Sequence, residues 1–191
     1  MKAGVLALQG AFREHREVLE ALGVHVVEVR TPEHLASIDA LLLPGGESTT
    51  MTRLLGTSGL REPLVGRVRE GLPVLGSCAG LILAAREVLD GRPDQEPLAA
   101  INLTVRRNAY GRQRDSFEAD LVVTCLTGGT FPGVFIRAPA IERVGPGVEV
   151  LAEHDDRPVL VRQGAVWVST FHPEIAGDLR IHQAFLQEVA A

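Results

Sequence analysis

The segment PVLGSCAGLILAA, Pro73 to Ala85, decides the fold class. Its first residues form an apolar run that predicts the end of a buried strand, and its last seven predict the start of a buried helix. Gly76, Ser77 and Gly80 already supply the residues that the turn between them needs. Cys78 is not required for the turn, so its position indicates a chemical role.

The segments before this turn alternate in the same way. Apolar runs over 3–8, 24–29 and 40–46 predict strands, and the patterns over 12–23, 49–55, 61–71 and 79–89 predict helices. Nearly continuous apolar strands joined by helices are typical of a parallel sheet that is covered on both faces. After the loop 90–97, alternating runs predict antiparallel strands, and residues 177–190 predict a last helix. We therefore expect an α/β three-layer sandwich with a largely parallel central sheet and an antiparallel extension, as a single domain over residues 1–191.

Composition excludes several classes of protein. Of the 191 residues, 46% are hydrophobic and 23% are charged, and no apolar run approaches the roughly 20 residues of a membrane span. The net charge of -5 gives no basic surface for nucleic acid. The two cysteines form no disulfide framework and no zinc motif, and the N-terminus shows no export signal, so we expect a cytoplasmic protein.

Gly76 to Gly80, G-S-C-A-G, has the G-x-nucleophile-x-G form of a sharp strand-to-helix turn, with Cys in the nucleophile position. The helix N-terminus favours the thiolate form of Cys78, and the Ala79 amide faces whatever the sulfur attacks. The alternative is a buried, inert thiol. For Cys125, which has no such turn, we prefer that alternative.

Two other segments fall at the carboxyl ends of predicted strands, where open parallel sheets bind ligands. In LLLPGGESTTM, residues 41–51, the amides of Gly46 or Glu47 could face an oxyanion, although a plain turn with Ser48 or Thr49 capping the next helix fits as well. In WVSTFHPEI, residues 167–175, His172 and Glu174 supply the base and the orienting carboxylate that a Cys nucleophile needs.

The other five histidines have simpler interpretations. His15 and His182 lie on helical patterns among polar residues, His25 and His34 lie in surface contexts, and His154 lies in an acidic turn with Asp155 and Asp156. No second cluster has the spacing of metal ligands, so we expect no metal site.

Together, these motifs resemble those of a known enzyme family. The Cys turn and His-Pro-Glu resemble the triad-type, class I glutamine amidotransferases, which have a flavodoxin-like fold. Further segments are similar to the glutaminase subunits of pyridoxal 5′-phosphate synthases, and they run in the same order along the chain: LALQGAFREH (6–15), LLLPGGESTTM (41–51), RNAYGRQRDSFEADL (107–121), GVFIRAP (133–139) and STFHPE (169–174). The catalytic positions show no departure from the family pattern.

The resemblance implies a role for each matching position. Cys78 would be the nucleophile, His172 the general base and then acid, and Glu174 the carboxylate that orients it. Gly46 and Ala79 would supply the oxyanion-hole amides. The glutamine pocket would be lined by Gly46, Glu47 and Ser48, closed by Arg107, Ile136 and Arg137, with Gln9 nearby.

The implied reaction is hydrolysis of L-glutamine to L-glutamate and ammonia through a glutamyl thioester, with no cofactor. The implied partner is the synthase subunit, which uses the ammonia to make pyridoxal 5′-phosphate. Two alternatives remain open. One is the glutaminase subunit of another synthase, in the histidine or purine pathway, and the other is a non-catalytic α/β protein that uses the thiol for redox sensing.

Overall fold

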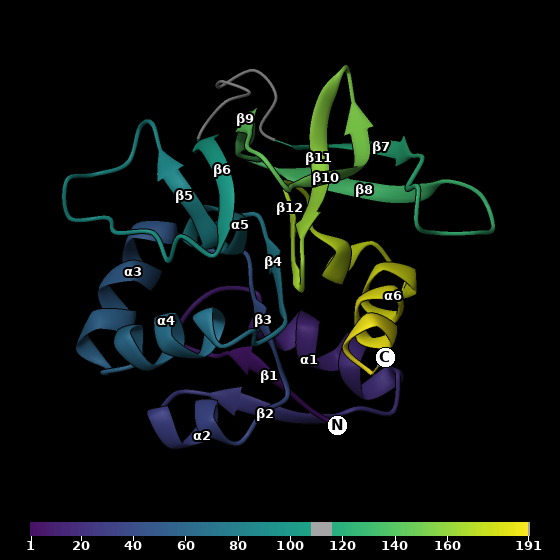
Figure 1. The fold of residues 1–191 in the computed structure, drawn as a ribbon. Coiled ribbons are helices and arrows are strands. Elements are labelled where there is room, and N and C mark those ends of the chain that lie inside the picture. The colour runs from purple at the N-terminus through teal and green to yellow at the C-terminus, as the bar shows by residue number, and fades with distance from the viewer. Residues whose placement is uncertain (108–115, 191) are drawn as a thin grey trace.

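A seven-stranded sheet forms the centre of the molecule, in the order β10-β11-β12-β4-β3-β1-β2 (Figure 1). The structure is a computed structural model and describes residues 1–107 and 116–190. Pairings from β12 through β4, β3 and β1 to β2 are parallel, and β10, β11 and β12 pair antiparallel. The strands are β1 (Lys2–Leu6), β2 (His25–Val29), β3 (Ala40–Leu43), β4 (Val74–Ser77), β10 (Glu149–His154), β11 (Arg157–Gln163) and β12 (Val166–Ser169).

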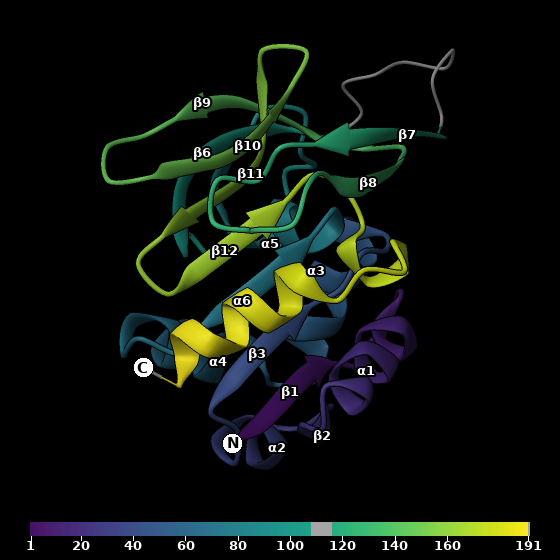
Figure 2. The ribbon, with the colours of Figure 1, turned by 90° about the vertical axis from the view of Figure 1, so that its right-hand side faces the viewer.

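The central strands are apolar on both faces, which explains their continuous hydrophobic runs. In β3, Leu41 and Leu43 pack into one hydrophobic cluster, while Ala40 and Leu42 pack into the other. Helices on each face cover these clusters, as the two ribbon views show (Figures 1 and 2). One face carries α2 (Pro32–Ala36), α3 (Ser48–Thr57), α4 (Arg61–Arg69) and α5 (Ala79–Ala84), and the other carries α1 (Phe12–Ala21) and α6 (Arg180–Val189). The predicted α/β sandwich is confirmed.

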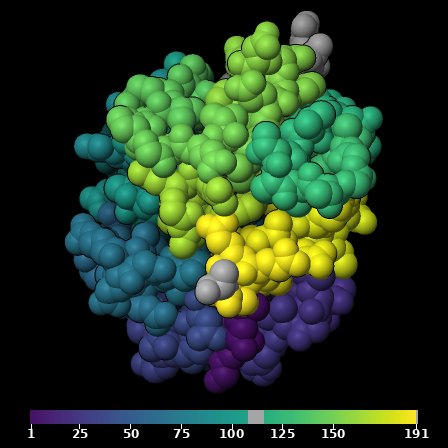
Figure 3. Space-filling model, turned by 45° about the vertical axis from the view of Figure 1, so that its right-hand side comes forward, coloured from purple at the N-terminus to yellow at the C-terminus, as the bar shows by residue number. Residues whose placement is uncertain are grey.

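The predicted antiparallel extension is also present. In its small sheet, β5 (Ala85–Val88) pairs parallel with β6 (Ile101–Arg106), and β6 pairs antiparallel with β9 (Ala140–Val144). An antiparallel hairpin of β7 (Ser116–Leu121) and β8 (Phe131–Ile136) completes the extension. A space-filling view shows α6, in yellow, between the green region of the β7–β8 hairpin and the purple N-terminal segment (Figure 3). Among the described helices, none has the length and apolar composition needed to cross a membrane.

The helix predicted over 79–89 is wrong in its second half. Helix α5 ends at Ala84, and Ala85, with φ -56° and ψ 158°, begins β5. Pairing with β6 fixes these residues as a strand, and this distant contact overrides a local pattern that fits a helix equally well. Strand β9 and the short helix α2 were not expected from the sequence. Of the family-like segment 107–121, residues 108–115 lie outside the described residues.

Candidate active site

Three adjacent parallel strands end at one cavity. Gly45 follows β3, Cys78 follows β4 and His172 follows β12, so the sheet brings together residues that are far apart in the sequence. The cavity has a volume of about 510 Å³. Its lining residues are Gln9, Gly10, Ala11, Gly45, Gly46, Glu47, Ser48, Cys78, Ile82, Arg107, Ile136, Arg137 and His172. Every residue predicted for the substrate pocket is in this lining.

Cys78 occupies the sharp turn between β4 and α5. Its φ of 49° and ψ of -100° are unusual for a residue with a side chain, and its amide donates to the Ser169 carbonyl at 2.9 Å. The flanking glycines are needed for close packing. A Cβ on Gly76 would lie 2.9 Å from the Gly80 carbonyl carbon, and one on Gly80 would lie 2.8 Å from the Leu43 carbonyl carbon. The turn thus holds a strained, mostly buried thiol at the edge of the cavity.

His172 lies between this thiol and a buried carboxylate. Its Nδ1 donates to Glu174 Oε1 at 2.7 Å, and Glu174 lies in the short 3-10 helix η1 (Pro173–Ile175). Burial disfavours the imidazolium, but hydrogen bonding with Cys78 and Glu174 outweighs it and raises the pKa of His172 to about 10. Burial also opposes ionisation of Glu174, yet the nearby His15 and His172 hold its pKa well below the usual range. The geometry therefore favours a protonated His172 beside an ionised Glu174.

Gly45 and Gly46 line the cavity beside His172. A Cβ on Gly45 would lie 2.9 Å from His172 Nδ1, so only glycine allows the imidazole to approach this closely. The Gly45 carbonyl accepts a hydrogen bond from the Ala11 amide at 2.9 Å. Because the peptide is trans, the Gly46 N–H points to the opposite side, away from Ala11.

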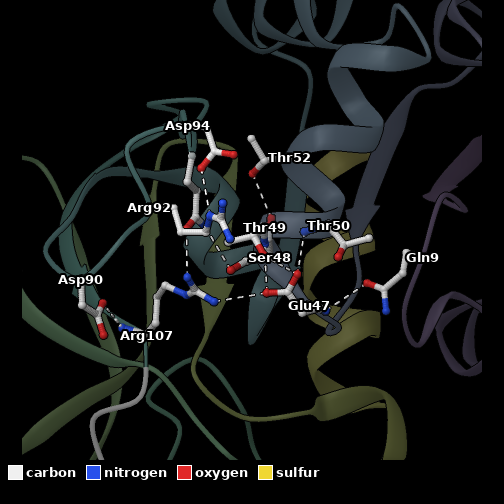
Figure 4. Close-up of polar contacts among 11 residues, drawn as sticks. Gln9, Glu47, Ser48, Thr49, Thr50, Thr52, Asp90, Arg92, Asp94 and Arg107 are labelled. Carbon is white, nitrogen blue, oxygen red and sulfur yellow. Dashed lines mark hydrogen bonds and ion pairs between the residues drawn. The ribbon is translucent and has the colours of Figure 1, made fainter.

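Glu47 lines the cavity and lies at the centre of a group of polar contacts (Figure 4). Its carboxylate accepts from the amides of Thr49 and Thr50, at 3.2 and 2.6 Å, and its own amide donates to Gln9 Oε1 at 3.0 Å. Burial would raise the pKa of Glu47, but hydrogen bonds from these threonines lower it to about 2. Glu47, rather than Ser48 or Thr49, is the N-cap of α3.

Arg107 joins this cap to the loop before β6. Its Nη2 donates to Glu47 Oε1 at 3.2 Å, and its Nη1 donates to Gln95 Oε1 at 3.3 Å. Gln95 Nε2 in turn donates to the buried Ser48 hydroxyl at 3.0 Å. No sequence motif singles out Gln95, because it lies in a polar loop and its contacts are with distant residues.

The interpretation of two histidines was wrong. His15 and His182, expected among polar residues of helices, are fully buried and their rings face each other behind Glu174. Helical spacing could have revealed this, since His15 lies three residues after Phe12 and four before Leu19, on the same side of α1. Ser77, expected only to form the turn, bridges His15 and Glu174.

The remaining candidates lie elsewhere. Cys125 is exposed after β7 and is not part of the cavity. His154 is 3.6 Å from Asp155, and within residues 1–107 and 116–190 no group of three or more His, Cys, Asp or Glu side chains could hold a metal ion.

Relatives with known names match the chain over nearly its whole length. A protein of Mycobacteroides abscessus named pyridoxal 5′-phosphate synthase subunit PdxT is 56% identical, over 98% of this chain and 97% of its own. One of Rhodococcus jostii with the same name is 54% identical, over 97% of this chain and 96% of its own.

Solved structures agree in fold. A crystal structure of a glutamine amidotransferase, 52% identical, matches with a TM-score of 0.93 over 99% of each chain. The structure of PurLQS from Thermotoga maritima, 16% identical, has a TM-score of 0.70 over 99% of this chain and 97% of its own, which shows a shared fold alone. The SNO glutamine amidotransferase family matches residues 5–191. This chain belongs to the SNO glutamine amidotransferase family.

Proposed function

We propose that this chain is the glutaminase subunit of a pyridoxal 5′-phosphate synthase and hydrolyses L-glutamine to L-glutamate and ammonia. The observation that carries the proposal is the array of Cys78, His172 and Glu174 at the edge of a cavity of about 510 Å³. Relatives more than half identical over nearly their full length carry the name of that subunit, which supports the choice among synthases.

The proposed reaction begins after His172 has taken the proton of the Cys78 thiol, and the Cys78 thiolate then attacks the side-chain carbonyl carbon of glutamine. His172, protonated at neutral pH, then donates its proton to the departing nitrogen, which leaves as ammonia while a glutamyl thioester remains. The neutral His172 next takes a proton from water, which attacks the thioester and releases glutamate. Glu174 keeps the Nδ1 proton of His172 in place, so that Nε2 faces the reacting groups.

Backbone amides stabilise the oxyanion in this proposal. Ala79 begins α5 directly after the proposed nucleophile, and Gly46 lines the same cavity as Cys78. The unusual backbone of Cys78 sets the position of the Ala79 amide, and the hydrogen bond from the Ala11 amide to the Gly45 carbonyl orients the peptide that carries the Gly46 N–H. Loss of one such donor costs about 10²- to 10³-fold in rate.

Charged groups at the entrance suit the amino-acid end of glutamine. Arg107 and Arg137 offer cations to its carboxylate, and the ionised Glu47 offers an acceptor to its ammonium. Gly46, Ser48 and Ile136 complete the wall, and Gln9 supports it through the Glu47 amide. We propose these residues as the substrate site.

Ammonia released in water is captured as ammonium, which is not a nucleophile, so a useful glutaminase must pass it directly to an acceptor site. We propose that a synthase subunit in a hetero-oligomeric complex provides that site. We also propose a single domain over residues 1–191 and a cytoplasmic location, where the thiol stays reduced.

The test is a glutaminase assay with and without the synthase subunit, on the wild-type chain, Cys78→Ala and the exposed-cysteine control Cys125→Ala. We expect glutamate and ammonia from wild type and Cys125→Ala, and none from Cys78→Ala. Turnover by Cys78→Ala would refute the nucleophile. Stimulation by a histidine- or purine-pathway synthase instead would refute the choice of partner.

A further inference from the structure

Two fully buried histidines lie behind the proposed triad. His15 comes from α1 and His182 from α6, which lie beside each other on one face of the sheet (Figures 1 and 2). His15 Nδ1 is 3.0 Å from His182 Nε2, and the ring centroids are 5.2 Å apart. Burying a polar side chain costs stability unless it is hydrogen-bonded, and an apolar pair would avoid that cost. Two buried imidazoles at this position therefore indicate a role other than packing.

The other nitrogen of His15 faces Glu174. His15 Nε2 lies 3.1 Å from the Ser77 hydroxyl oxygen and 3.5 Å from Glu174 Oε2. The Ser77 hydroxyl donates to Glu174 Oε1 at 3.3 Å, the same oxygen that accepts from His172 Nδ1 at 2.7 Å. All of these groups are buried.

These contacts select one arrangement of protons. Burial lowers the pKa of His15 and lowers that of His182 to about 3, so both rings are neutral near pH 7 even with Glu174, His172 and Glu14 as the nearby charged groups. A proton on His15 Nε2 faces the carboxylate, whereas a lone pair there would repel it. His15 Nδ1 must then accept, so His182 Nε2 donates to it, and His182 Nδ1, which has no partner among the described residues, carries a lone pair.

We propose that His15 is a positioning residue, which holds the Glu174 carboxylate in line with His172, and that His182 fixes the tautomer of His15. The chain of donors runs from His182 to His15, then to Ser77 and Glu174. Among the described residues, the basic side chains within 4.0 Å of the Glu174 carboxylate are His172 and the neutral His15, so no Lys or Arg does this work. The inference rests on the proposed glutaminase reaction.

The kinetic test compares His15→Asn with His15→Gln, whose side-chain amides extend to different distances from the backbone. Both are assayed as the full chain with the synthase subunit present. Gln at position 15 places its amide near the lost Nε2, whereas Asn places it near Nδ1. We expect His15→Asn to lower kcat about 10- to 100-fold, as loss of an outer hydrogen-bond partner does, while KM stays within about threefold. His15→Gln should recover most of this loss. The exposed His25→Gln is the matched control.

A double variant tests the order of the chain. His182→Leu should lower kcat by roughly 3- to 10-fold, because it acts one contact further away. His15→Asn with His182→Leu should be no slower than His15→Asn alone, whereas independent packing effects would multiply. Melting temperatures of all variants show whether the kcat losses merely follow stability.

Alkylation of Cys78 by iodoacetamide gives a readout that needs no turnover, with Cys125 replaced by Ser. When Glu174 is held less firmly, it stabilises the protonated form of His172 less. The alkylation rate of His15→Asn should therefore rise at higher pH than that of the wild type, and the profile of His15→Gln should not shift. The proposal would be overturned if His15→Asn and His15→Gln lost kcat equally, or if the losses of His15→Asn and His182→Leu multiplied in the double variant. It would also be overturned if His15→Asn changed KM alone, or left both kcat and the alkylation profile unchanged. Turnover by Cys78→Ala would instead refute the proposed function, and the alkylation profiles would still test the positioning role.

Discussion

Gly45→Ala is expected to disable the active site without disturbing the fold. The φ of Gly45 is not positive, so alanine adds no backbone strain there. Its Cβ, however, would lie 2.9 Å from His172 Nδ1 and closer still to Cε1. Ordinary contact requires roughly 3.5 Å or more, so the imidazole must move by about 1 Å, and a displacement of that size costs about 10²-fold in rate.

The assay is glutamate production with the synthase subunit present, together with the melting temperature. Gly66→Ala is the matched control, because it lies in α4 with nothing within 4 Å of the added Cβ. We expect full activity and equal or higher stability from the control, since Ala favours a helix over Gly by up to about 1 kcal/mol. Activity of Gly45→Ala within about threefold of wild type would show that the glycine does not set the position of His172.

Three further predictions address the triad and the entrance. His172→Asn should remove essentially all turnover, whereas the loss of kcat in Glu174→Gln should be roughly a hundredfold smaller. The proposed base is indispensable, and the group that orients it is not. Unchanged turnover in Glu174→Gln would mean that another acid holds the ring. Arg107→Lys should raise KM for glutamine about tenfold with little change in kcat. The reason is that one ammonium cannot contact both Glu47 and Gln95 as the guanidinium does. A loss confined to kcat would contradict this. The pKa of Glu47 is lowered from 4.5 to about 2, so its ionised form stabilises the fold above about pH 4.5, and this contribution is lost as the pH falls toward 2. The difference in melting temperature between wild type and Glu47→Gln should therefore shrink over that range, and a constant difference would show that the charge is irrelevant.

The parallel core was predictable because its signals are local. Strand β3 is a run of apolar residues because both of its faces are buried, and the Gly45-Gly46 pair after it marks where the strand stops. The strand β5 was not predictable, because its residues also fit a helix and only pairing with β6 decides between them. Local sequence therefore specified the layers apart from the short helix α2, but not the partner of an edge segment.

The same division applies to the site. The turn around Cys78 and the His172-Pro173-Glu174 segment were recognisable because each motif lies within a few consecutive residues. The contact of Gly45 with the imidazole, the bridge through Gln95 and the burial of His15 depend on residues from distant segments. No pattern within one segment reports such contacts.

The parallel pairing of β4 with β12 determines at which stage of synthesis and folding a new chain can first hydrolyse glutamine. About half of the chain separates Cys78 from His172, and β12 must insert beside β4 before the imidazole meets the thiol. Closing such a long loop is slow compared with forming the local turn around Cys78. A chain still on the ribosome, or one cut before β12, holds the proposed nucleophile without its proposed base. Catalysis thus begins only when folding is nearly complete, which spares cellular glutamine from unfinished copies of the enzyme.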